Sequence, residues 1–157
     1  MSKYQWLLFL HVTGAFVFIG AAVAAWVLGF AAARRERPSE IALLFRLTRI
    51  AGALFGIGLT FILVFGIWLA IDSYSITDGW ILGALGLLVL ALVTGGIAGG
   101  RDKRARMLAE QLARDGDVPN AELSAAVRDV PALVLNAAST LLAIAILVLM
   151  IYKPGAP

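Results

Sequence analysis

The chain has 157 residues, of which 61% are hydrophobic, and it carries a formal net charge of +3 and no cysteine. This hydrophobic share exceeds the roughly 45–50% apolar content of a soluble domain, so the sequence predicts an integral membrane protein. The missing cysteine excludes disulfides, thiolate catalysis and thiolate metal sites.

Four segments are long and apolar enough to cross a bilayer, which takes about 20 apolar residues per helix. They are predicted at about residues 4–33, 50–71, 79–100 and 130–152. The first is expected to be a retained helix, because its apolar part is longer than the roughly 7–15 residues of a signal peptide. The expected fold is therefore all-α, with one domain over residues 1–157 that forms a bundle of four transmembrane helices.

The basic residues predict the orientation of these spans. Five of the 13 Lys and Arg lie between the first two spans and six lie between the last two, whereas the 72–78 loop has none. By the positive-inside rule, we expect both basic loops in the cytoplasm and both termini outside the plasma membrane. Because the basic residues flank spans, they predict contact with membrane lipids and no nucleic-acid partner.

The longer connection, residues 101–129, is predicted to be a cytoplasmic helical hairpin. The stretch RDKRARMLAEQLAR at 101–114 favours a continuation of the third helix, and DGDVPN then ends it. Asn120 is placed to cap a short helix, and Pro131 is placed to begin the last span.

Small residues recur at helical spacing on three spans, and such faces allow close packing between membrane helices. The pairs predict packing seams and a homo-oligomer through small-residue helix faces; they are Gly52 with Gly56, Gly95 with Gly99, Gly96 with Gly100, and the run Ala21, Ala25 and Gly29.

His11, the chain's single histidine, lies within the first span. An ionisable group inside a span is a functional hypothesis by default. Gly14 and Phe18 lie on or near its helix face, so these three residues are the candidate cofactor-binding set, with Gly14 giving room for a ring. Three roles remain open: a neutral imidazole with a structural hydrogen bond, an axial ligand of haem or another tetrapyrrole, and proton or substrate handling. Haem iron is the only metal expected, since zinc and copper sites need more ligands.

A polar layer is expected just outside this span, formed by Asp72, Tyr74, Asp78 and Lys153. Asp72 or Asp78 could orient or protonate the His11 imidazole if the helices bring them close.

The chain resembles the bacterial integral membrane family called domain of unknown function 2269, and the resemblance covers nearly its whole length. It rests on LHVTG at 10–14, FIG at 18–20, FGIWL at 65–69, GW at 79–80 and MIYKP at 150–154. That family is similar in layout to four-helix protoporphyrinogen-oxidase-like and copper-resistance membrane domains. The resemblance implies that His11 and Lys153 serve haem or metal, although the chain lacks the further histidines of those domains.

Two functions remain open on this basis. The first is a small membrane protein associated with haem or another tetrapyrrole through His11. The alternative is a non-enzymatic oligomeric bundle that acts as a scaffold or assembly factor, or that transports a small solute or ion between subunits. No nucleophile elbow or phosphate loop occurs, so no catalytic residue is assigned and enzymatic activity is left undecided.

Overall fold

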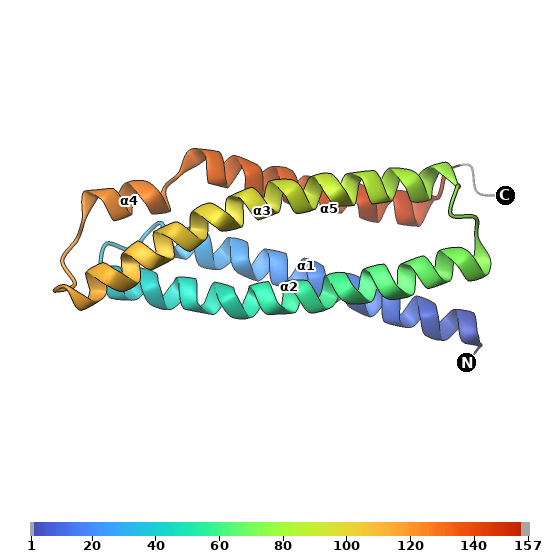
Figure 1. Cartoon of the computed structure of the whole chain (residues 1–157), viewed down its shortest axis with the longest axis horizontal. Helices are drawn as coiled ribbons and strands as arrows, with labels where there is room; N and C mark the ends of the chain where they lie inside the picture. Colours follow the sequence, from blue (N-terminus) through green and yellow to red (C-terminus); the bar gives the residue numbers. More distant parts are fainter. Residues whose placement is uncertain (1, 155–157) are drawn as a thin grey trace.

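The computed structural model describes residues 2–154, and these residues form helices joined by loops, without strands (Figure 1). Four of its helices are long and apolar enough to cross a membrane, which confirms the predicted all-α fold class with four long apolar helices. The helices are α1 (Lys3–Ala32), α2 (Pro38–Ser73), α3 (Gly79–Arg114), the short α4 (Ala121–Val127) and α5 (Val130–Tyr152).

The long helices form two pairs. Helix α1 packs mainly on α2, and α3 packs mainly on α5, with fewer contacts between α2 and α3 and very few between α1 and α5. Both ends of the described chain lie at the end of the molecule that holds the α2–α3 loop, here called the terminal end (Figure 1). The opposite end, which holds α4, is called the basic end.

Two glycines bring α1 and α2 into direct contact. A Cβ atom on Gly58 would lie 2.6 Å from the backbone nitrogen of Phe18, and one on Gly14 would lie 2.6 Å from the Cβ of Phe61. Next to this contact, the rings of Phe18 and Phe55 have centroids 4.1 Å apart. Any side chain at Gly58 would therefore push the two backbones apart.

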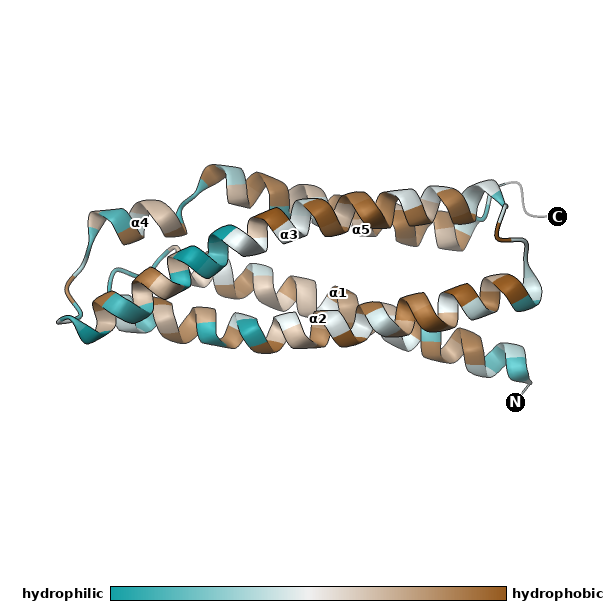
Figure 2. Ribbon diagram, in the orientation of Figure 1, coloured by the Kyte–Doolittle hydropathy of each residue, from teal (hydrophilic) through white to brown (hydrophobic). Residues whose placement is uncertain are grey.

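Helices α2 and α3 are longer than a bilayer requires. Each has 36 residues, a length of about 54 Å at 1.5 Å per residue, against a hydrocarbon core of about 30 Å. Hydrophilic residues gather on both helices toward the basic end (Figure 2). Both helices therefore project beyond the apolar layer at this end.

The projecting segments share a well-packed core with α4. The largest side chains in it are Ile41 and Leu123, each 1% exposed, and Phe45, 4% exposed. Helix α4 begins where the sequence predicts, because the Asn120 side chain accepts hydrogen bonds from the amides of Glu122 and Leu123. The hairpin thus packs on its own chain.

A polar contact links the α3–α4 loop to the start of α2. The Asp117 carboxylate accepts hydrogen bonds from the backbone amide and the hydroxyl of Ser39, both at 2.7 Å. These two bonds hold the pKa of Asp117 below its ordinary value of 3.8.

This contact predicts a pH-dependent local protection. Because the pKa of Asp117 is lowered by folding, the stabilisation is fully present above pH 3.8 and is lost as the pH falls through the lowered pKa. We expect the Ser39 amide, after correction for intrinsic rates, to exchange hydrogen slowly at pH 5–8 and faster below about pH 4. Asp117→Asn should remove this pH dependence, whereas Asp115→Asn should leave it intact; equal profiles in both variants would contradict the assignment.

Candidate functional site

The His11 side chain lies against α2. Its Nδ1 atom is 3.1 Å from the carbonyl oxygen of Ile62, and since a carbonyl only accepts, Nδ1–H is the donor. The ring sits directly over Gly66, where a Cβ atom would lie 2.8 Å from Nδ1 and from Cε1. In the neutral imidazole this tautomer leaves a lone pair on Nε2.

Gly14 and Phe18, the two residues predicted to lie beside a ring at His11, both pack on α2. Gly14 packs on the α2 backbone, with Gly58 O and Ile62 N each 3.0 Å from its ideal Cβ position. Phe18 is 6% exposed and packs on Phe55. Gly14 therefore contacts the α2 backbone on this face of α1, and its role beside a bound ring stays a prediction.

The polar layer at the terminal end is built differently from the expectation. Asp72 pairs with Lys3, and Asp78 accepts a hydrogen bond from the Ser75 amide. The imidazole of His11 is instead held by a backbone carbonyl. The hypothesis that either carboxylate orients His11 is therefore not supported.

Tyr74 and Lys153 do come together in this layer. The Lys153 ammonium donates a 2.6 Å hydrogen bond to the Tyr74 hydroxyl and lies 5.7 Å from the centroid of the Trp80 ring. This hydrogen bond lowers the pKa of Tyr74. The Tyr4 hydroxyl is 3.4 Å from that of Tyr74, so this cluster joins α1, α2 and α5 at the terminal end.

The contact between His11 and Gly66 predicts energetic coupling between the two residues. In Gly66→Ala, the added methyl group would displace the ring and break its hydrogen bond to Ile62, at a cost of about 1–2 kcal/mol. The same substitution in a His11→Ala background should cost nothing, which gives a coupling energy of about 1 kcal/mol or more. Thermal unfolding in detergent measures it, with Gly83→Ala as a control because its Cβ would meet only an ordinary 3.6 Å contact. Additive effects would contradict the contact.

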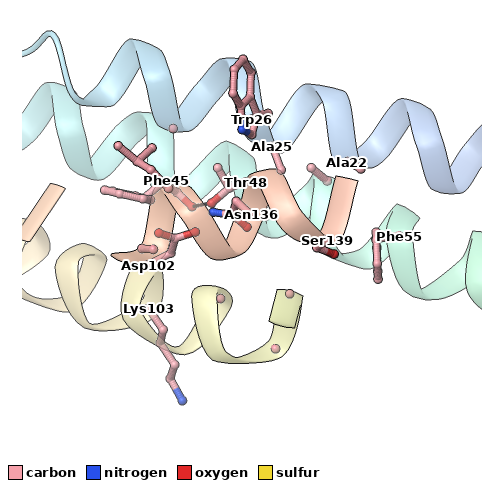
Figure 3. A pocket seen from close by; sticks show the side chains of 18 of the residues that line it. Ala22, Ala25, Trp26, Phe45, Thr48, Phe55, Asp102, Lys103, Asn136 and Ser139 are labelled. Atoms are coloured by element: carbon pink, nitrogen blue, oxygen red, sulfur yellow. Dashed lines mark hydrogen bonds between the residues drawn. The ribbon is translucent and has the colours of Figure 1, made fainter. Parts of the chain in front are cut away.

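A larger site lies between the two helix pairs. It is a partly open cavity of about 590 Å³ with residues from every helix in its wall (Figure 3). Ala22, Ala25 and Trp26 of α1 line one side, and Ser139 of α5 lies across from α2. His11 does not contribute to this wall.

Several glycines belong to the wall. Gly29, Gly52, Gly96 and Gly99 line the cavity, and a Cβ on any of them would meet nothing within 4 Å. Gly95 behaves as the sequence predicts, since its Cβ would lie 3.1 Å from Ser139 Oγ. Of the seam predicted on α1, Ala21 is buried within this chain, whereas Gly29 faces open space. The remaining glycines of the predicted pairs, Gly52, Gly56, Gly96, Gly99 and Gly100, also have no neighbouring helix within 4 Å of an added Cβ.

Polar groups gather where the cavity reaches the basic end. Asp102 of α3 lies beside Asn136 of α5 (Figure 3). Arg49 and Arg106 also belong to the wall. The Nε atom of Arg106 is buried with no hydrogen-bond partner in the described chain, and its nearest carboxylate, Glu110, is 3.9 Å away. The sequence places Asn136 inside the last span as a polar residue but does not indicate this cluster.

The sequence profile described as "Predicted integral membrane protein (DUF2269)" matches residues 5–154. The chain belongs to this family. No curated protein and no solved structure matches the chain.

Within this DUF2269 chain, the described residues contain no group of three or more His, Asp or Glu that could hold a metal ion. The imidazole tautomer of His11 suits a metal ligand, because ligating histidines usually donate their other N–H to a carbonyl or carboxylate.

Proposed function

We propose that this DUF2269 protein binds a hydrocarbon-chain ligand from the bilayer in the cavity between its two helix pairs. The observation that carries the proposal is the glycine-lined wall: four glycines face open space instead of a neighbouring helix. A volume of about 590 Å³ lies in the range of roughly 300–1,000 Å³ that small-molecule sites occupy.

The arrangement of the helices supports a route for such a ligand. Because α1 and α5 share very few contacts, an apolar chain could enter between them from the lipid phase. By the positive-inside rule, the basic end faces the cytoplasm and the termini face outward from the plasma membrane. The ligand would then come from the cytoplasmic leaflet.

Paired glycine substitutions test this proposal. Gly52→Leu and Gly99→Leu would fill the cavity, whereas Gly56→Leu and Gly100→Leu add the same side chain outside its wall, where a Cβ also meets nothing within 4 Å. We would purify all five chains in mild detergent and measure co-purified lipid by native mass spectrometry. We expect retention by the wild type and both controls and a loss of about tenfold or more in the two filled variants. Equal retention in all five, or no retention by the wild type, would overturn the proposal.

A tetrapyrrole bound through His11 is the second candidate function. It is favoured by the hydrogen bond from Nδ1–H to Ile62, which leaves Nε2 to act as a ligand. Expression with haem precursors, followed by absorption spectra of the wild type and His11→Ala, tests it. A stoichiometric Soret band that the variant loses supports this function, and a colourless folded wild type rejects it.

A further inference from the structure

The cavity has the depth of one bilayer leaflet. Along α3 its wall runs from Ala91 to Arg106, which is about 22 Å at 1.5 Å per residue. One leaflet of hydrocarbon is about 15 Å deep, half of the roughly 30 Å core. The cavity therefore matches one acyl chain together with the headgroup region above it.

The polar end of the cavity carries more positive than negative charge. Arg49 and Arg106 are in the wall and make no ion pair closer than 3.9 Å within the described residues. Of the two carboxylates in the wall, Asp129 forms an ion pair with Arg101 at 2.6 Å. Asp102 is therefore the one that can offset the charge of the two arginines. Lys103 adds a positive charge at the rim and points away from the cavity (Figure 3).

On the basis of the proposed cavity ligand, we infer that this ligand is an anionic phospholipid from the leaflet at the basic end. One acyl chain lies along the glycine-lined wall, and the phosphate is bound by Arg49 and Arg106. Guanidinium groups suit this role because they bind phosphate oxygens through two parallel hydrogen bonds.

The position of Arg49 and Arg106 at the basic end of the cavity favours a bilayer phospholipid over a free fatty acid as the ligand. Basic pockets between membrane helices at the headgroup level are suited to anionic lipid headgroups. Asp102 and Asn136 belong to the same cavity wall as the two arginines, and their oxygens could accept hydrogen bonds from headgroup hydroxyls such as those of glycerol.

The test is a competition between defined lipids. Delipidated full-length protein in mild detergent receives equimolar phosphatidylglycerol, phosphatidylcholine and oleate, and native mass spectrometry gives the occupancy of each. The variants are Arg49→Gln and Arg106→Gln, alone and together. The matched controls are Arg46→Gln and Arg104→Gln, which remove the same charge from the same helices outside the cavity wall.

We expect phosphatidylglycerol to bind about tenfold or more tightly than phosphatidylcholine, and each cavity arginine to contribute about fivefold to that preference. The double variant should bind both phospholipids equally, while the controls keep the preference. A preference for oleate, or a phosphatidylglycerol preference that survives the double variant, would overturn the inference.

Gly99→Leu separates this inference from the proposed function. If it abolishes binding while the wild type prefers no headgroup, the cavity binds a chain without charge selection and only the present inference fails. If phosphatidylglycerol binds Gly99→Leu as tightly as the wild type, the lipid lies outside the cavity and both proposals fail.

Discussion

Replacement of Gly58 by leucine is expected to cause a large loss of stability, because it places a side chain between the backbones of α1 and α2. The first side-chain carbon would lie 2.6 Å from the backbone nitrogen of Phe18 and 2.9 Å from the carbonyl oxygen of Gly14. Since both atoms belong to the α1 backbone, no side-chain rotation relieves the clash and the helices must separate. We expect a loss of about 3 kcal/mol or more, at the upper end of the range for overpacked sites.

Gly56→Leu is the control for this substitution. It lies two residues away on α2, where a Cβ would meet nothing within 4 Å, and leucine has a higher helix propensity than glycine. Its unfolding temperature in detergent should equal or exceed that of the wild type. Similar losses in both variants would show that α1 and α2 do not meet closely at Gly58.

Truncation of Leu123 is the second change with a large expected effect. This side chain is 1% exposed and fixes α4 to the core made with Ile41, Phe45 and Ala109. Because large-to-small substitutions in a well-packed core cost about 2–5 kcal/mol, Leu123→Ala should release α4 from α2 and α3. Limited proteolysis of the 115–120 loop measures this release.

Met107→Ala is the matched control, because Met107 is 56% exposed and lies on the same part of α3 without belonging to this core. We expect cleavage of the 115–120 loop to accelerate strongly in Leu123→Ala and to stay at the wild-type rate in Met107→Ala. Unchanged cleavage in Leu123→Ala would mean that α4 is held by other contacts.

The apolar helices were predictable because a run of about 20 uncharged apolar residues has one stable form in lipid. The continuation of α3 to Arg114 and the Asn120 cap also followed from local residue preferences. The start of α2 at Pro38 did not follow from these preferences, because the predicted span begins only at about residue 50. Its first turns carry Glu40, Arg46 and Arg49, and these charges end the apolar run without ending the helix.

The candidate sites were harder to predict, because helical spacing gives the face of a residue but not what lies opposite. His11 lies on the face of α1 that contacts α2, in line with its predicted orientation toward the bundle, and Gly14 on the same face meets the α2 backbone. Gly52 and Gly99 carry the same local pattern and face a cavity. Only the separation of the two helix pairs distinguishes these cases, and that separation depends on contacts between residues far apart in the chain.

The pairing of α1 with α2 and of α3 with α5 also bears on how the protein is made. During synthesis the N-terminal part of a chain folds first, and the α1–α2 contact needs no residue beyond Ser73. This hairpin can therefore close in the membrane while the rest is still on the ribosome. Helix α3 has to wait for α5, which leaves it without its main partner until α4 and the last span have been translated.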